Sequence, residues 1–80
     1  MKKTFNINLG GIVFHIDEDA YELFDKYLSN LRIHFSKEEG GEEIVHDMEL
    51  RISELFSERL NERNQVITLN DVEEIIAQMG

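Results

Sequence analysis

Apolar and polar residues alternate along the start of the chain, over residues 4–9 and again over residues 12–16. This period of two is typical of β-strands that bury one face. Gly10 and Gly11 separate the two segments and suit the positive φ angles of a two-residue turn, which pairs Leu9 with Ile12. Continued outward, that register pairs Ile7 with Phe14 and Phe5 with Ile16, and places all six residues on one face. Because a hairpin alone is marginally stable in water, this face is expected to pack against helices.

Two longer segments carry apolar residues at helical spacing. The first begins after Asp17, a suitable N-cap, and gives way to a polar break at residues 36–41 that ends in two glycines. Its apolar stripe consists of Ala20, Phe24, Tyr27, Leu28, Leu31 and Phe35. The second is expected to start near Glu42 and to end between Asn61 and Asn64. Its inner face consists of Ile44, Val45, Met48, Ile52, Leu55 and Phe56.

A third helical pattern follows a short β-branched segment. Residues 65–67 (Gln-Val-Ile) are a candidate third strand, and Thr68 and Asp71 have the spacing of a capping box. The apolar residues after them are Leu69, Val72, Ile75, Ile76 and Met79. The full pattern predicts a single soluble α+β domain over residues 1–80. In it an N-terminal hairpin packs on three helices, in the order β-β-α-α-(β)-α.

Charge restricts the partners of this domain. Seventeen acidic residues against eight basic ones give a formal net charge of −9, and the basic residues form no cluster. Nucleic-acid affinity comes largely from basic side chains that displace counterions, so direct binding of DNA or RNA is not expected. There is no cysteine, and the longest apolar run is Ile12-Val13-Phe14. The chain therefore predicts no disulfide, no signal peptide and no membrane span within these residues.

The residue types that carry catalysis do not form a recognisable constellation. No serine lies in a nucleophile elbow, and Gly10-Gly11 lacks the flanking residues of a phosphate loop. Glu43 and His46 have the Glu-x-x-His spacing of half a di-iron motif, but no second copy of it occurs. The paired glutamates are interpreted as solvated helix faces. We expect no enzyme activity, and no catalytic, metal-binding or cofactor-binding residue.

Two apolar residues depart from the helical stripes. Ile33 lies nearly opposite the stripe of the first helix, and Leu50 nearly opposite that of the second. Both are candidate contacts for a protein partner. The unpaired edge of the short hairpin is a third candidate contact surface, because it presents free backbone donors and acceptors.

Three parts of the chain together resemble a known family. They are residues 1–11 with 14–21, residues 43–56 and residues 66–76. They are similar to the N-terminal cytoplasmic region of phage-shock-protein-C-like (PspC) membrane proteins, described as stress-responsive transcriptional regulators. The resemblance implies that the chain is the cytoplasmic part of a longer, membrane-anchored protein. It also implies regulation through a protein partner, with no cofactor and no catalytic residue. Self-association as a homodimer is the other expectation, because the unpaired sheet edge permits a dimer without requiring one.

The alternative is a free-standing DNA-binding regulator in which the second and third helices form a helix-turn-helix. The connection over residues 61–67 is long for that unit, and the third helix carries no basic residue. A small enzyme or a metal protein is the remaining class, and bound metal in the purified domain would reveal the latter.

Overall fold

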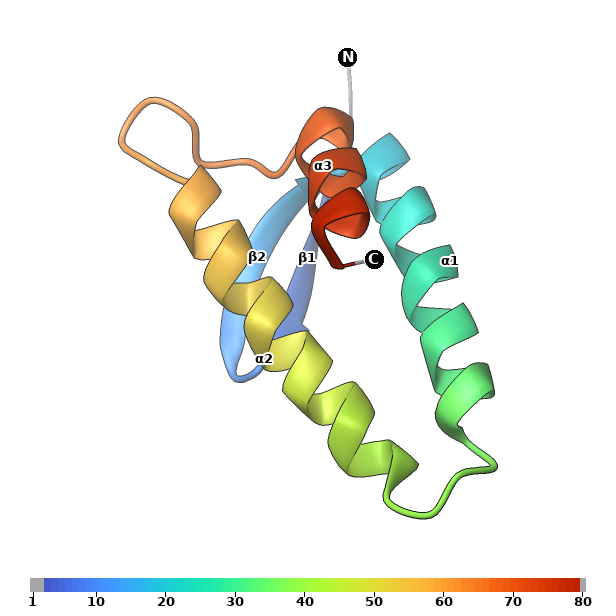
Figure 1. Ribbon diagram of the computed structural model, residues 1–80. Coiled ribbons are helices and arrows are strands. Elements are labelled where there is room, and N and C mark those ends of the chain that lie inside the picture. The colour runs from blue at the N-terminus through green and yellow to red at the C-terminus, as the bar shows by residue number, and fades with distance from the viewer. Residues whose placement is uncertain (1–2, 80) are drawn as a thin grey trace.

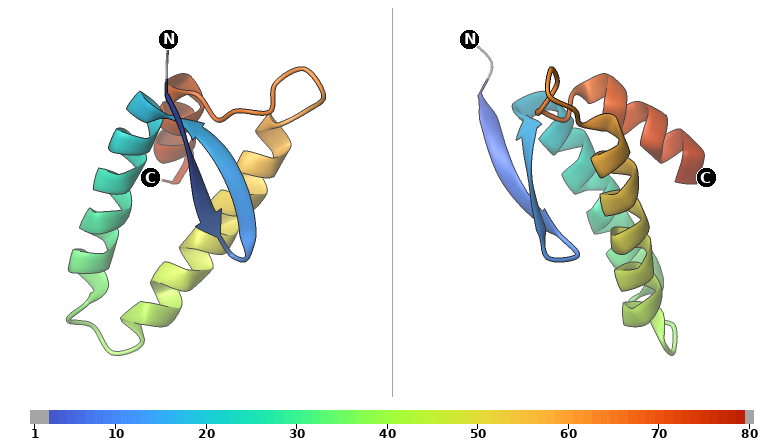
Figure 2. Two further views of the ribbon diagram at one scale, coloured as in Figure 1. Left: turned by 180° about the vertical axis from the view of Figure 1, so that it is seen from behind. Right: turned by 90° about the vertical axis from the view of Figure 1, so that its left-hand side faces the viewer.

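The computed structural model describes residues 3–79, which form a β-hairpin followed by three α-helices (Figure 1). The elements are β1 (Thr4–Leu9), β2 (Ile12–Asp17), α1 (Glu18–Phe35), α2 (Gly41–Arg59) and α3 (Leu69–Met79). Helices α1 and α2 run antiparallel as a middle layer, with the hairpin on one side and α3 on the other (Figure 2). The predicted α+β architecture and element order are confirmed. The lower ends of α1 and α2 extend beyond both covering elements (Figure 1).

The hairpin has the predicted register. Leu9 pairs with Ile12, Ile7 with Phe14 and Phe5 with Ile16, around a turn in which Gly10 and Gly11 have φ angles of 58° and 87°. Positive φ at both central positions is the conformation that glycine adopts without steric cost. Of the six residues on the predicted inner face, Leu9, Phe14 and Ile16 are buried, whereas Phe5 and Ile12 near the ends of the hairpin stay exposed.

The candidate third strand is reduced to one residue. Ile67 forms an isolated parallel bridge with Ile16, in which the Ile67 N–H donates to the His15 carbonyl at 2.9 Å and the Asp17 N–H donates to the Ile67 carbonyl at 3.0 Å. The chain then enters α3 directly, since Leu69 is already helical, so the pairing stops there. The sheet therefore has two strands, and β1 is an edge strand.

The core lies where the three layers meet. Phe56 is fully buried, and its ring centroid lies 5.5 Å from that of Phe14 and 5.1 Å from that of Phe24. These rings join the hairpin, α1 and α2 in one aromatic cluster. The other buried apolar residues that pack together with them are Leu9, Ile16, Ala20, Leu28, Ile52, Ile67, Val72 and Ile75.

Helix α2 differs from the prediction at both ends. Ile44, predicted to face inward, is 38% exposed, because the N-terminal part of α2 extends below the hairpin and α3 (Figure 1). The helix stops at Arg59, short of the predicted Asn61 to Asn64. Leu60 adopts an extended conformation, and the Asn61 side-chain carbonyl accepts the N–H groups of Arg63 and Asn64. This local turn competes with further helix.

The backbone N–H groups at the starts of α1 and α3 find their hydrogen-bond acceptors in different ways. Asp17 is the N-cap of α1 but makes no side-chain capping bond, and the Glu18 N–H donates instead to the Lys3 carbonyl at 2.9 Å. At α3 the predicted capping box is present: the Thr68 N–H donates to Asp71 Oδ2 at 3.1 Å, and the Asp71 N–H donates to Thr68 Oγ1 at 3.3 Å. Over residues 3–79, no helix is long and apolar enough to cross a membrane.

Candidate protein-binding surfaces

A groove of about 750 Å³ lies between the end of α1 and the start of α2. Phe35 and Val45 supply its apolar surface; Phe35 is half-buried, and Val45 is 9% exposed. Its charged lining residues include Glu38, Glu42, Glu43, Glu49 and Arg32. We call this feature the α1–α2 groove. It combines an apolar base with a mainly acidic rim, and lies on the part of the helix pair that the hairpin and α3 leave uncovered (Figure 1).

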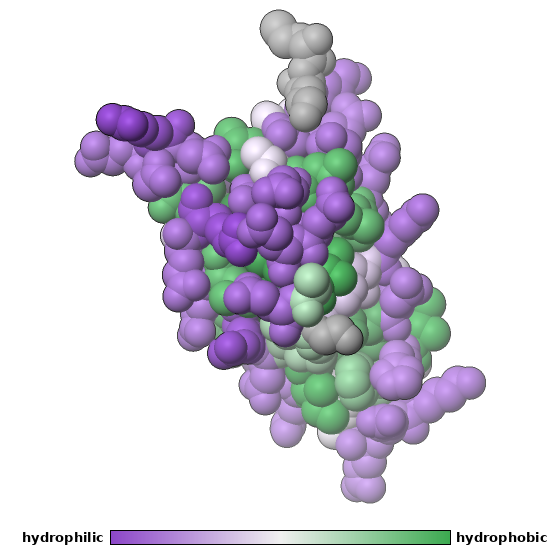
Figure 3. Space-filling model, turned by 45° about the horizontal axis from the view of Figure 1, so that its top comes forward, coloured by the Kyte–Doolittle hydropathy of each residue, from purple (hydrophilic) through white to green (hydrophobic). Residues whose placement is uncertain are grey.

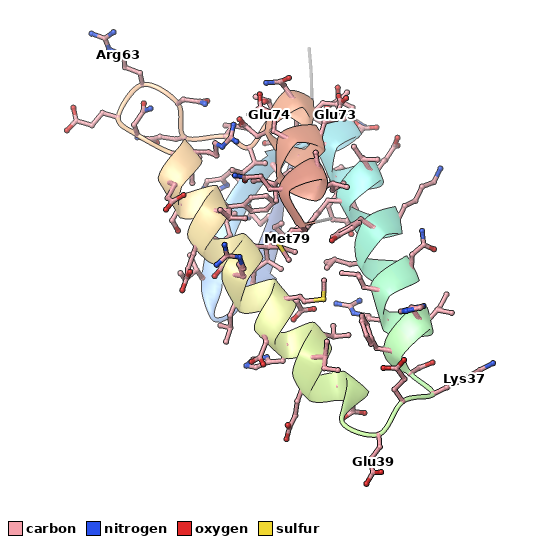
Figure 4. All side chains as sticks on the ribbon, in the orientation of Figure 1. Lys37, Glu39, Arg63, Glu73, Glu74 and Met79 are labelled. Atoms are coloured by element: carbon pink, nitrogen blue, oxygen red, sulfur yellow. The ribbon has the colours of Figure 1, made fainter. Side chains whose placement is uncertain are left out.

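The turn that closes the α1–α2 groove depends on two glycines. Gly40 has a φ of +76°, and Gly41 is buried against the end of α1. A Cβ at Gly41 would lie 1.9 Å from the Phe35 carbonyl oxygen, so only glycine allows this approach of the two helices. The same oxygen accepts the Glu38 N–H at 3.1 Å, which holds it in place. Lys37 and Glu39 point outward from this turn (Figure 4).

One ion pair crosses between the two helices. Arg32 Nη2 donates to Glu49 Oε1 at 3.0 Å, and the Arg32 side chain remains 59% exposed. An exposed pair of this kind contributes little to stability. It neutralises one of the four glutamates, so the remaining rim stays negative. The groove therefore suits a partner segment with apolar and basic side chains.

The structure separates the two residues that the sequence identified as partner contacts. Ile33 on α1 is 68% exposed. Leu50 on α2 is 38% exposed but lies against the hairpin turn, where a Cβ on Gly10 would be 2.6 Å from Leu50 Cδ2. Leu50 therefore has a structural contact that helical spacing alone does not reveal. Neither residue lines the α1–α2 groove, which sequence reasoning missed. The sequence feature that could have indicated this groove is the Gly40-Gly41 pair, which lies between two acidic segments.

The groups whose pKa is shifted lie away from the α1–α2 groove. At the junction of α2 and α3, Arg59 hydrogen-bonds Glu74 and lies 3.7 Å from Asp71 Oδ1. The hydrogen bonds from Arg59 and then Asn70 lower the pKa of Glu74, and the bond to Glu74 raises the pKa of Arg59. Burial raises the pKa of Tyr27. The contacts of Arg59 with Glu74 and Asp71 join α2 to α3, so we assign these residues a role in the stability of the fold.

The Glu43–His46 pair lies on one exposed side of α2 and lines the α1–α2 groove. Among residues 3–79, no group of three or more His, Cys, Asp or Glu side chains is placed to hold a metal ion. On the face seen in Figure 3, hydrophilic residues cover most of the surface, with apolar areas between them. Glu73 and Glu74 project from the upper end of α3 (Figure 4).

Comparison with protein-family models, with curated proteins and with solved structures found no match to this chain.

Proposed function

We propose that this chain is a non-enzymatic interaction domain of a stress-responsive regulator, and that its α1–α2 groove binds a basic helical segment of a partner protein. The observation that carries the proposal is the apolar base formed by Phe35 and Val45 inside an acidic rim. The regulatory setting rests on the sequence resemblance alone. It would place the domain on the cytoplasmic side of the inner membrane, as part of a longer anchored protein.

The α1–α2 groove suits an amphipathic helix for two physical reasons. Apolar area removed from water contributes roughly 25 cal/mol per Å², and the half-buried Phe35 ring is the largest apolar side chain available there. The acidic rim attracts basic residues that flank an apolar helix face, which raises the association rate and disfavours acidic competitors. The net charge of −9 on the whole chain further favours basic partner segments over acidic ones.

The charge of α3 disfavours the DNA-binding alternative. Its only charged residues among Leu69–Met79 are Asp71, Glu73 and Glu74. A recognition helix needs donors for base edges and cations for phosphates, and this helix would bring negative charge to the duplex. Retardation of duplex DNA that weakens as salt is raised would restore the alternative.

The proposal is tested with a fluorescent amphipathic peptide of about 16 residues, long enough to become helical, that carries leucine on one face and lysine on the other. Anisotropy titration is expected to give salt-sensitive binding. Replacing both Glu42 and Glu43 with Gln removes two charges from the rim and weakens binding by about 1 kcal/mol, or about fivefold.

The matched control replaces Glu62 and Glu73, two exposed glutamates outside the α1–α2 groove, with Gln. It changes the net charge equally and should leave the affinity within about twofold of the wild-type value, apart from a small long-range contribution. Equal losses in the two double variants would mean that the peptide senses only overall charge, and would refute the groove as the site.

A further inference from the structure

Strand β1 presents backbone hydrogen-bonding groups to its open side. Residues 13, 15 and 17 of β2 direct their backbone groups away from β1, because His15 accepts from Ile67 and Asp17 donates to it. Their cross-strand partners in the antiparallel register, Thr4, Asn6 and Asn8, therefore direct their own N–H and C=O groups away from β2. The open edge of β1 is thus a template for another strand.

That edge borders a second groove, of about 300 Å³, between β1 and α1. We call it the β1–α1 groove. Its apolar lining comes from Ile7 and Leu9 on the strand and from Tyr21, Phe24 and Leu28 on the helix. The Tyr21 ring packs against the Phe5 ring in a tilted arrangement, with ring centroids 5.1 Å apart, which keeps the helix and the strand together at one end. A strand added beside β1 would direct alternate side chains into this space.

The charge of α1 indicates which strand would fit. Over its first turns the helix carries Glu18, Asp19, Glu22 and Asp25 against a single Lys26. Asp25 and Arg32 are the charged residues that line the β1–α1 groove, and Arg32 is paired with Glu49 at 3.0 Å, which leaves Asp25 to set the charge of the groove. A lysine or arginine on the incoming strand can bury its aliphatic stem against Tyr21 and reach the Asp25 carboxylate with its charged end. A second copy of β1 would instead bring another acidic α1 and a further charge of −9 to the same interface.

We propose that the β1–α1 groove binds an extended, basic segment of a partner protein, which adds to the hairpin as a third full strand antiparallel or parallel to β1. Backbone bonds to Asn6 and Asn8 provide the affinity, and alternate apolar and basic side chains provide the selectivity. This site shares Arg32 with the α1–α2 groove, but its other lining residues lie on β1 and on α1 between Tyr21 and Leu28, so the two grooves can be tested separately.

The probe is a capped peptide of about six residues that alternates valine and lysine, the length of a typical strand. The readout is amide hydrogen exchange followed by NMR. With free peptide at about nine times its Kd, exchange of the outward-facing Asn6 and Asn8 amides should slow about tenfold. The same peptide with every backbone amide N-methylated loses the donors for strand pairing along both of its edges and should not bind. A valine–glutamate peptide should bind at least about tenfold more weakly, because its charges repel Asp25.

A pair of variants locates the contact on the protein. Asn6→Pro removes the outward N–H without removing a bond between β1 and β2, and should weaken the valine–lysine peptide about tenfold. Asn6→Ala keeps that N–H and loses the side-chain hydrogen bond with His15 Nδ1, at 2.6 Å, so it should bind within about twofold of wild type. Thermal unfolding checks that both variants fold, and the N-methylated peptide provides the same test with an unchanged protein.

Two results would overturn the proposal. One is equal binding of the N-methylated and unmodified peptides, which would show that strand pairing is not involved. The other is concentration-dependent protection of Asn6 and Asn8 without peptide, accompanied by a dimer in sedimentation, which would mean that a second copy occupies the edge.

Discussion

Gly41 allows the sharpest test of the packing between α1 and α2. Alanine stabilises a helix interior relative to glycine by about 0.8–1.0 kcal/mol, which is an upper limit for Gly41 at the first position of α2, and Gly41 has no positive φ angle that would forbid a side chain. Here the opposite result is expected. The added Cβ would lie 1.9 Å from the Phe35 carbonyl oxygen and 2.8 Å from the Phe35 carbonyl carbon, both of which are backbone atoms. The helices must therefore move apart for Gly41→Ala to be accommodated.

The size of the effect follows from two opposing contributions. Overpacking costs typically 1–3 kcal/mol, and the upper end applies because a backbone carbonyl held by the Glu38 N–H cannot rotate away. Subtracting the helix preference of alanine leaves a net loss of about 2 kcal/mol. For a domain of this size, that lowers Tm by about 8–16 °C.

The assay is thermal unfolding followed by circular dichroism, with urea unfolding as a second measure of the free energy. Lys37→Ala is the control, because Lys37 lies in the same turn and points outward (Figure 4). Its effect should stay within about 0.5 kcal/mol. An unchanged or raised Tm for Gly41→Ala would refute the close approach of α1 and α2, and with it the shape of the α1–α2 groove.

Three further predictions concern other parts of the structure. Thr68→Ala removes the capping box of α3 and should cost about 1 kcal/mol, measured by urea unfolding. Arg59 lowers the folded-state pKa of Glu74, so the Arg59–Glu74 interaction stabilises the fold above the unfolded pKa of about 4.3. This stabilisation is lost as the pH falls through the folded pKa. The Tm difference between wild type and Glu74→Gln should therefore vanish in acid. Ile33→Glu should leave Tm within about 4 °C of wild type, whereas Leu50→Glu should lower it further because Leu50 packs on the hairpin turn. Similar Tm values for those two variants would contradict the placement of Leu50.

The hairpin and the three helices were predictable because local patterns specify them. A two-residue Gly-Gly turn leaves one register that keeps Leu9, Phe14 and Ile16 on the same face, and the structure has that register. Likewise, the Thr68–Asp71 spacing marks the start of α3, and both of its backbone bonds form. These features depend on residues close in sequence.

Features that depend on distant segments were not predictable in the same way. Ile44 fits the inner stripe of α2, yet it is exposed because neither the hairpin nor α3 reaches that end of the helix. The strand expected at residues 65–67 needed a neighbour along its whole length, and only Ile16 pairs with Ile67. The same applies to Leu50, whose contact with Gly10 arises when the hairpin folds over α2.

The α1–α2 groove also lay outside sequence reasoning. The sequence predicts a break at residues 36–41, but not that the buried Gly41 lets the ends of α1 and α2 approach closely. The position of Phe35 and Val45 at the base of a groove follows from that approach. Most of the acidic rim, by contrast, is visible in the sequence as Glu38, Glu42 and Glu43 on either side of the two glycines.

The central claim is that the α1–α2 groove binds a basic, amphipathic helix. Its most direct test is an NMR titration of the isotope-labelled domain with the leucine–lysine peptide. The predicted result is a continuous set of backbone shifts centred on Phe35, Gly41 and Val45, reduced in the Glu42→Gln, Glu43→Gln double variant. Shifts spread evenly over the acidic surface, or centred on α3, would contradict the claim.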